Sequence, residues 1–503
     1  MRRTRAPYRS TITAVATVMV AAGAALTGAL AARAAAGCRV TYTVTSQWHG
    51  GFGANVGVTN LGDPVTGWRL TWSFAAGQAV TQLWNGTVTQ SGAQVSVANA
   101  AWNANLATGA GVAVGFNGSW TAANPVPTDF ALNGVACNGN PTPSAPATSV
   151  LDQVSTPSRV RVAGAGVQYT WPGTYFEGRF RGTGVGLVLN DANNDYVVQV
   201  DGATVATVVT PGQATHRVRN LTSGEHTVRL AKRTESPWAA GEFAGLVADA
   251  GGAILSKPAP RARKMEFIGD SWTAGYGDMS TTRECAATGG VNRNTNADAA
   301  FGALTAKGLN ADYQVNAWSG LGMVRNYNGQ NPGYDFRTYY ETDLQAVHNS
   351  QTWPVPGTWR PQVVVIGLGI NDFSTALNAG ERWTTIDQLA AAYRAAYLGF
   401  LDKLRTRYGA GAHFVLTYPD LSYQTTALAD SIQQIVRTRN AAGDARVSAL
   451  YYDNTALGLD LLGCDWHPSQ RDHQLLAAAV TRHLGTLPLT WWNTGPVRSG
   501  SGN

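Results

Sequence analysis

Short runs in which apolar and polar residues alternate dominate the first part of the chain. ANVGVTN and GWRLTWSF are examples, and Gly, Asn, Pro and Ser separate such runs. A period of two is typical of strands with one buried face, and no helical period interrupts it over residues 37–138. The pattern predicts an all-β sandwich there, followed by a semi-rigid linker, GNPTPSAPATS, at residues 139–149.

Residues 150–260 repeat this pattern in YTWPGTYFEGRF, GVGLVLND and DYVVQVDG, which predicts a second small, jelly-roll-like β-sandwich. From residue 261 the pattern changes to apolar runs, at 265–268, 363–368 and 414–417, that alternate with helical periods. One amphipathic helix is indicated by apolar residues three and four positions apart: Ile386, Leu389, Tyr393, Tyr397, Phe400 and Leu404. Residues 261–488 are therefore expected to form an α/β domain with a parallel sheet, followed by a short tail, 489–503.

The length of the chain agrees with this division, because 503 residues with 44% hydrophobic content exceed what one core accommodates. The first nine residues, MRRTRAPYR, carry four arginines and no acid, and an uncharged stretch rich in Ala, Val, Thr and Gly follows up to residue 32. This pattern predicts a secretory signal over residues 1–36, cleaved before Gly37, with an uncleaved membrane anchor as the alternative.

Cleavage would remove five of the 37 basic residues and none of the 31 acidic ones, which leaves a net charge of +1. The basic pI of the whole chain therefore gives no reason to expect nucleic acid as a partner, and after cleavage no membrane contact is expected. The mature protein is expected outside the cell.

An oxidising compartment favours disulfides, and the four cysteines fall as Cys38 with Cys137 and Cys285 with Cys464. The first pair brackets the predicted sandwich, and closing so long a loop stabilises a fold by roughly 4 to 5 kcal/mol in the chain-entropy model. The second pair would join two loops of the α/β domain, with two inert buried thiols as the alternative.

Tryptophans distinguish the first sandwich. Trp68 stands between apolar neighbours and is expected in the core, whereas Trp48, Trp84 and Trp102 stand among Gly, Asn and Gln, where strand ends meet solvent. Exposed aromatic residues indicate a ligand.

The same module resembles the family 2 carbohydrate-binding modules over its whole length, from its terminal cysteines through QWHGGFGANVGVTN, GWRLTWSF and GVAVGFNGS. The resemblance implies that the three tryptophans form a flat strip that stacks on glucose rings, with cellulose as the partner. It also implies that hydroxyl groups of the sugar are bound by three polar side chains, Asn55, Gln82 and Asn117.

Four motifs in the α/β domain carry residues suited to ester hydrolysis. Ser271 in GDSWTAGYG follows the first predicted strand, Gly320 lies in NAWSGLG, Asn371 ends VVVIGLGIND, and His467 lies in GCDWHPSQRDH. Each motif alone is typical of a turn or a helix cap. Together they supply a nucleophile, two oxyanion donors and a base at the carboxyl ends of strands, where α/β sheets bind ligands.

These motifs resemble, in order, the conserved blocks of SGNH (GDSL-type) hydrolases. The resemblance implies attack by Ser271 with help from His467, and an oxyanion held by the N–H groups of Ser271 and Gly320 and by the Asn371 side chain. No group of His, Cys and Asp has metal-ligand spacing, so no metal and no cofactor are expected.

One position departs from that family. The aspartate of the triad usually stands three residues before the histidine, where this chain has Cys464, and Asp465 stands only two before. Asp465 is kept as a candidate catalytic residue, with a backbone carbonyl as the alternative partner of the His467 ring. Four tryptophans, each either core or cleft lining, are Trp272, Trp318, Trp353 and Trp466.

The second sandwich together with the α/β domain, residues 155–484, resembles the family 2 carbohydrate esterases in YTWPGTYFEGRFRGT, GEHTVRLAKRTE and KMEFIGDSWTAGYG. The resemblance implies a secreted esterase that removes acetyl groups from xylan, glucomannan or a similar acetylated hemicellulose. A lipid or short-chain carboxylesterase and a nonenzymatic cellulose-binding protein are the alternatives.

Overall fold

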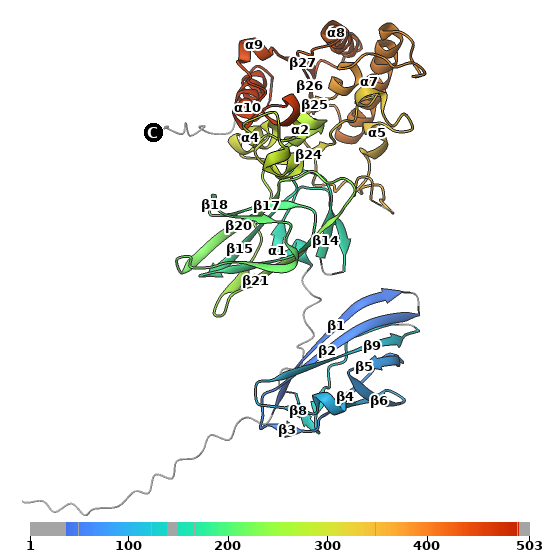
Figure 1. Ribbon diagram of the computed structural model, residues 1–503, viewed down its shortest axis with the longest axis vertical. Coiled ribbons are helices and arrows are strands. Elements are labelled where there is room, and N and C mark those ends of the chain that lie inside the picture. Colours follow the sequence, from blue (N-terminus) through green and yellow to red (C-terminus); the bar gives the residue numbers. More distant parts are fainter. Residues whose placement is uncertain are drawn as a thin grey trace, which may run out of the picture. The chain divides into compact units, whose positions relative to one another are not determined.

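A computed structural model describes residues 37–48, 50–121, 123–137, 149–164, 166–347, 349–489 and 491. The predicted signal segment (1–36), nearly all of the predicted linker and most of the tail lie outside the described residues. The described residues form two compact units, one up to Cys137 and one from Ser149 (Figure 1). The domain boundaries within residues 149–489 stay a prediction.

The first unit is a sandwich of two antiparallel sheets, as the alternating pattern predicts. One sheet has the order β1 (Cys38–Trp48), β2 (Gly51–Asn60), β9 (Gly111–Ser119) and β5 (Ala79–Trp84). The other has the order β11 (Val135–Ala136), β10 (Ala131–Leu132), β4 (Arg69–Ser73), β7 (Gln94–Asn99) and β6 (Gly86–Ser91), and a short ribbon pairs β3 (Val65–Thr66) with β8 (Asn105–Leu106). Trp68 is buried in the core between the sheets, as expected.

The second unit begins with the short helix α1 (Val150–Gln153) and another two-sheet sandwich. One sheet runs β12 (Val154–Ser155), β15 (Tyr175–Gly182), β20 (Gly224–Lys232), β17 (Asp195–Val200) and β18 (Ala203–Val209), and β22 (Ala253–Leu255) pairs with β15. The facing sheet runs β13 (Arg161–Ala163), β14 (Gly166–Tyr169), β21 (Gly241–Ala248), β16 (Val185–Asp191) and β19 (Gly212–Val218). Inward residues of both sheets, such as Phe176 and Leu187, share one core.

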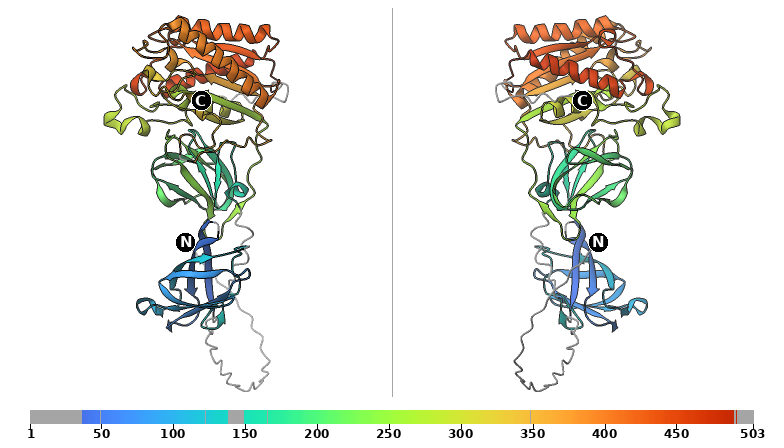
Figure 2. Two further views of the ribbon diagram at one scale, coloured as in Figure 1. Left: turned by 90° about the vertical axis from the view of Figure 1, so that its right-hand side faces the viewer. Right: turned by 90° about the vertical axis from the view of Figure 1, so that its left-hand side faces the viewer.

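The rest of this unit is built on a parallel sheet, which confirms the predicted α/β class. Its order is β24 (Ala311–Ala317), β23 (Arg263–Gly269), β25 (Val363–Gly367), β26 (His413–Pro419) and β27 (Val447–Tyr452). Successive residues of each strand enter two separate cores: Val363 and Val365 pack on one face, Val364 and Ile366 on the other. Helices therefore cover both faces, which explains why these strands read as unbroken apolar runs (Figure 2).

Two long helices on each face make up most of this cover: α4 (Phe301–Gly308) with α10 (Gln470–Gly485), and α7 (Ile386–Tyr408) with α8 (Thr425–Ala441). The predicted amphipathic helix is α7, whose amino end is capped by the Thr385 hydroxyl. One-turn helices lie in the connections: α2 (Ser271–Ala274), α3 (Gly290–Arg293), α5 (Phe336–Tyr339), α6 (Ile370–Phe373) and α9 (Asn454–Leu457). Among the described residues, no helix is both long and apolar enough to cross a bilayer.

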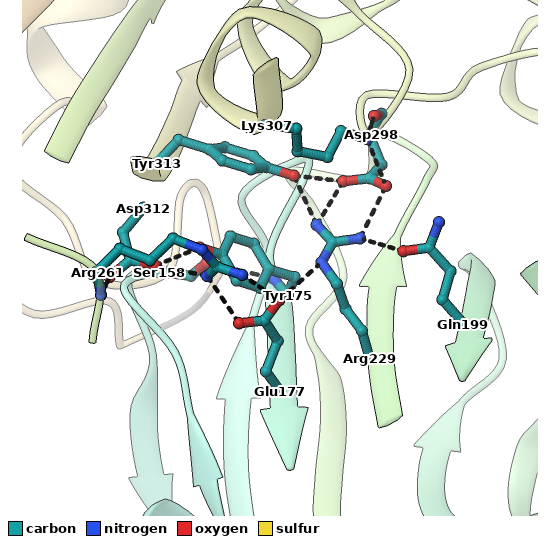
Figure 3. Close-up of polar contacts among 10 residues, drawn as sticks. All are labelled: Ser158, Tyr175, Glu177, Gln199, Arg229, Arg261, Asp298, Lys307, Asp312 and Tyr313. Atoms are coloured by element: carbon teal, nitrogen blue, oxygen red, sulfur yellow. Dashed lines mark hydrogen bonds and ion pairs between the residues drawn. The ribbon is translucent and has the colours of Figure 1, made fainter. Parts of the chain in front are cut away.

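A buried polar network joins the second sandwich to the parallel sheet (Figure 3). Arg229 of β20 forms a bidentate ion pair with Asp298, at 2.6 and 2.9 Å, and Tyr313 of β24 accepts from the same guanidinium at 2.7 Å. Arg261 joins Glu177 of β15 to Asp312 of β24. Arginines suit such positions because their planar fork matches carboxylates. The network holds sandwich and sheet as one body at the amino end of β24.

A second buried pair connects the same two parts of this unit. Arg159 precedes β13 and lies 3.2 Å from Glu266 of β23, with both side chains fully shielded from solvent. Its guanidinium also lies over the rings of Trp171, Tyr340 and Trp353.

Candidate active site

Ser271 lies directly beyond β23, the first strand of the parallel sheet along the chain and the one between β24 and β25. β23 ends at Gly269, Asp270 caps α2 through the Trp272 N–H, and Ser271 is the first residue of that helix. The residue is buried, at 5% exposure. The strand-to-helix turn is the position that the GDS motif predicts.

The His467 ring approaches Ser271 from the loop before α10, although 196 residues separate them in sequence. Nε2 lies 2.8 Å from the Ser271 Oγ, and Nδ1 lies 2.9 Å from the Cys464 carbonyl and 3.1 Å from the Asp465 carbonyl. Carbonyl oxygens only accept, so the proton of the neutral ring belongs on Nδ1, and Nε2 is left to accept the serine proton. Burial lowers the pKa of His467, which favours this neutral form.

The Asp465 carboxylate does not contact the His467 ring, unlike the aspartate of a catalytic triad. Its Oδ2 accepts a hydrogen bond from the Tyr276 hydroxyl at 2.9 Å, and only its backbone carbonyl faces His467. The cause is local: Asp465 and Trp466 have φ values of 51° and 66°, which turn two carbonyls toward the imidazole and the carboxylate away from it. Such left-handed non-glycine residues are rare and cluster at functional sites.

Gly320 and Asn371 lie beyond the carboxyl ends of the two strands that flank β23. Gly320 follows β24 with φ +81°, a conformation that favours glycine, and a Cβ there would meet open space rather than protein. Asn371 lies in α6 after β25, and its amide nitrogen donates to the Leu321 carbonyl at 2.9 Å, which leaves its second N–H for another acceptor. In the described part of the chain, neither the Ser271 nor the Gly320 backbone N–H donates a hydrogen bond to another residue. Three unused donors thus belong to the segments that surround the serine.

A buried carboxylate fixes the loop that follows Gly320. Asp372 accepts from the backbone N–H groups of Met323, Val324 and Arg325 at 2.8 to 2.9 Å. Burial raises the pKa of Asp372 to about 6, and these three hydrogen bonds oppose that rise. Since Asn371 is its neighbour in sequence, the two candidate oxyanion segments are held together.

The Cys285–Cys464 disulfide joins the loop after the nucleophile to the loop that carries the histidine. Cys464 is also the residue whose carbonyl accepts from the His467 Nδ1. Two backbone bonds run beside the disulfide, from the Cys464 N–H to Gly277 and from the Asp465 N–H to Arg283. The Cys464 carbonyl, which accepts from the His467 Nδ1, is thus held by a disulfide and by two backbone hydrogen bonds.

The four tryptophans that the sequence left as either core or cleft lining differ in burial. Trp272 and Trp353 are buried, at 9% and 5% exposure, and belong to cores. Trp318 is partly buried, whereas Trp466 is 65% exposed beside His467, with the Arg283 guanidinium 3.6 Å from its ring. One ring face of Trp466 is therefore covered by the Arg283 guanidinium, and the rest of the indole is open to solvent.

Two site residues were missed by sequence reasoning. The Tyr276 ring packs against the His467 ring, with centroids 4.3 Å apart, and its place in GDSWTAGYG was the available signal. Glu235 lies in RTESPW, between two strands of the second sandwich, and contacts Ser319, the residue before Gly320. Burial raises the pKa of Asp270 to about 8, with smaller contributions from the charges of Asp372 and Glu235.

The first unit carries a separate aromatic surface on the β1–β2–β9–β5 sheet. The indole of Trp48 lies over Gly51 and that of Trp84 over Gly115, since a Cβ at either glycine would overlap the ring. Trp102 follows β7 in a loop that reaches the Trp84 turn through the bond from Asn103 to Asn85. Exposed fractions of 52%, 44% and 72% leave these three indoles open to solvent.

The polar residues expected beside this strip share its sheet face. Asn55 of β2 and Trp84 of β5 both pair with Gly115, and Asn117, two residues further along β9, pairs with Gln82. The Asn117 amide donates to Gln82 at 3.4 Å. The Cys38–Cys137 disulfide closes the same module. Within the described ranges, no three His, Cys, Asp or Glu side chains gather as a metal site would require.

Three families match the chain in succession. Residues 38–137 match the cellulose binding domain family, 159–258 the carbohydrate esterase 2 N-terminal family and 267–475 the GDSL-like lipase/acylhydrolase family. An acetylxylan esterase / glucomannan deacetylase of Cellvibrio japonicus is 41% identical over 327 residues, 64% of this chain and 86% of that protein. The endoglucanase CelA of Streptomyces lividans is 50% identical over 130 residues, which cover 25% of this chain and 28% of that enzyme.

Solved structures agree with the sequence matches. A carbohydrate esterase whose active site is described as having divergent catalytic and non-catalytic binding functions has a TM-score of 0.61 at 38% identity, covering 67% of this chain and 98% of that one. A family two carbohydrate esterase from Clostridium thermocellum, solved with cellohexaose, has a TM-score of 0.58 at 30% identity, covering 67% of this chain and 99% of that one. The chain belongs to the family 2 carbohydrate esterases, with a GDSL-type hydrolase domain beside the family's β-sandwich and a cellulose-binding module before them.

Proposed function

We propose that the chain is an exported serine esterase that removes O-acetyl groups from xylan or glucomannan and is held on cellulose by its first module. The observation that carries the proposal is the contact of 2.8 Å between the His467 Nε2 and the Ser271 Oγ at the edge of a parallel sheet. The 41% identity to an acetylxylan esterase / glucomannan deacetylase supports the substrate class. Two disulfides and a cellulose-binding module support action outside the cell.

In this mechanism Ser271 attacks the acetyl carbonyl while the His467 Nε2 takes its proton. The N–H groups of Ser271 and Gly320 and the Asn371 amide donate to the oxyanion that forms. His467 then gives the proton to the ester oxygen of the sugar as its bond to the carbonyl carbon breaks, so that the sugar leaves with a free hydroxyl and the acetyl group stays on Ser271. Water activated by the same ring releases acetate by the reverse sequence.

Trp466 favours a sugar over a lipid as the substrate. Its exposed indole beside His467 offers a flat apolar surface, which suits the apolar face of a pyranose ring. A lipid esterase would be expected to present a long apolar groove and would gain little from a cellulose-binding module.

Acetate release from acetylated glucomannan and acetylated xylan tests the proposal against a long-chain triacylglycerol. Release from either polysaccharide, with slow or no cleavage of the lipid, is expected. Cleavage of the lipid alone would favour the carboxylesterase alternative, and no release from any of the three, by protein that still binds cellulose, would leave a binding protein.

Substitution of Trp84 by alanine is expected to weaken cellulose binding about 10-fold or more, since one stacked indole contributes roughly 1.5 to 3 kcal/mol of apolar burial. Depletion from solution by microcrystalline cellulose measures this change. Val135→Ala is the matched control, because Val135 is also exposed (43%) in this module but belongs to the other sheet. An equal loss of cellulose binding in both variants would contradict the proposal that the tryptophan strip binds cellulose.

Removal of the second disulfide by Cys285→Ser with Cys464→Ser is expected to affect stability and rate together. The bond closes a span of 179 residues, worth about 5 kcal/mol in the chain-entropy model. The histidine's carbonyl partner also loses one anchor, so kcat on 4-nitrophenyl acetate should fall about 10-fold even well below the melting temperature. The control pair, Cys38→Ser with Cys137→Ser, should leave kcat unchanged. A normal kcat in the first double variant would show that the backbone alone positions His467.

A further inference from the structure

Glu235 belongs to the β-sandwich but contacts the loop that carries Gly320. It lies between β20 and β21, and its carboxylate accepts twice from Ser319: Oε1 from the backbone N–H at 2.7 Å, and Oε2 from the hydroxyl in a short bond. Ser319 is the residue directly before Gly320. Both acceptor atoms of the carboxylate are thus directed at one residue of the candidate oxyanion loop.

The segment around Glu235 is held firmly enough to act as a fixed support. The hydroxyls of Thr234 and Ser236 both donate to the Asn194 side chain, at 2.8 and 2.6 Å. On the side of the α/β domain, the Arg233 carbonyl accepts from Ala297 at 2.9 Å and the Pro237 carbonyl from Ala346 at 3.1 Å. Glu235 therefore stands between residues that are bonded to both parts of the second unit.

After Gly320 the oxyanion loop is held by Asp372 and by the Asn371 amide, whereas Glu235 holds the side before Gly320. The Trp318 N–H donates to Gly269, and the Tyr327 N–H donates to the Gly320 carbonyl. A Cβ at Gly320 would contact nothing within 4 Å beyond its chain neighbours, so no other residue packs on the side where a side chain would project. The Gly320 N–H must nevertheless point at one place, because oxyanion donors act only at 2.7–3.1 Å from the developing charge.

We infer that Glu235 is a positioning residue through which the β-sandwich completes the esterase site, by holding Ser319 so that the Gly320 N–H faces the oxyanion. The sandwich then has a role in the reaction beyond covering the sheet. The effect is exerted through Ser319 and not on the substrate, because both carboxylate oxygens are engaged by that residue. The inference rests on the proposed ester hydrolysis at Ser271.

Steady-state kinetics of Glu235→Ala on 4-nitrophenyl acetate test the inference. A displaced oxyanion donor should lower kcat about 10- to 100-fold, less than the loss of a whole donor, with KM changed less than about threefold. Ser319→Ala, which removes only the hydroxyl bond, should show a smaller loss of kcat. The double variant should be no slower than Glu235→Ala, because the two residues act as one unit.

The matched control is Glu177→Gln. Glu177 is also a sandwich carboxylate with bidentate contacts, to Arg261, which joins it to Asp312 near the amino end of β24 (Figure 3). Gly320 follows the other end of that strand. This variant should lower the melting temperature and keep kcat. If Glu235→Ala folds poorly, the milder variant Ser319→Ala replaces it: its kcat is measured, and its melting curve shows whether it is folded.

A wild-type kcat in folded Glu235→Ala would overturn the inference, as would a loss confined to KM or an equal loss of kcat in Glu177→Gln. Multiplicative effects of Glu235→Ala and Ser319→Ala would do so as well. A generic acetyl ester separates this test from that of the substrate class: hydrolysis of 4-nitrophenyl acetate without release from polysaccharides would contradict the proposed substrate and still test Glu235.

Discussion

Ser271→Ala is expected to lower the rate of acetate release at least about 10³-fold, because removal of the nucleophile leaves only binding and oxyanion contacts. The substitution deletes one oxygen from a side chain that is 5% exposed, so the fold should persist. Cellulose binding belongs to a separate module and should be unchanged. Acetate assays and cellulose depletion on the same preparation measure both.

Ser431→Ala is the control for Ser271→Ala. Ser431 is also buried, but it lies in α8 and is bonded to Arg394. It should keep the wild-type kcat. Residual activity of Ser271→Ala above about a tenth of wild type would assign the nucleophile to another group.

His467→Ala should cost as much as the loss of the serine, about 10³-fold or more, whereas Asp465→Asn should stay within about threefold of wild type. The contrast follows from geometry: His467 Nε2 contacts the nucleophile, but the Asp465 carboxylate is bonded to Tyr276 and its backbone carbonyl survives the change to asparagine. Measurement of kcat/KM on 4-nitrophenyl acetate separates a dyad from a triad. A loss in Asp465→Asn of about 10⁴-fold, typical of triad aspartates, would restore the carboxylate role.

The pH profile gives the same test a second readout. Since burial holds the pKa of His467 below 6.5 and the base must be neutral, activity should persist below pH 6.5 and be lost only as pH falls through that lowered pKa. The charge of Asp465 raises the pKa of His467 and opposes the burial effect. Asp465→Asn should therefore move the acid limb of kcat/KM to lower pH, and a shift upward would contradict this arrangement.

The fold could be predicted from periodicity because each layer leaves its own signature. Strands exposed on one face alternate, as in the two sandwiches, and strands covered on both faces, such as β25, are uninterrupted apolar runs. Both predictions are confirmed. The site residues on strand ends could be anticipated for a related reason: the carboxyl ends of β23, β24 and β25 meet at one edge, so Ser271, Gly320 and Asn371 converge there.

The partner of His467 could not be settled from the sequence, since it depends on two backbone rotations and not on residue type. Positive φ at Asp465 and Trp466 turns the carbonyls inward, and neither residue is one whose identity demands that conformation. The role of Glu235 could not be predicted for a different reason: its contact with Ser319 joins positions 84 residues apart in two separate layers. No periodic signal marks such a contact.

The buried ion pairs between the sandwich and the parallel sheet determine which parts of this enzyme can be recombined. A chimaera that replaced only residues 150–260 with a foreign sandwich would leave Glu266 and Asp298 buried without Arg159 and Arg229. Asp298 would keep its pair with Lys307, but Glu266 would keep only the neutral donors of Asn316 and Tyr340. A buried carboxylate that loses its ion-pair partner costs about 3 to 5 kcal/mol, enough to offset much of the stability of an ordinary domain. The second sandwich and the hydrolase domain are therefore exchangeable only together, and the boundaries suited to domain exchange lie before the sandwich and after the hydrolase domain.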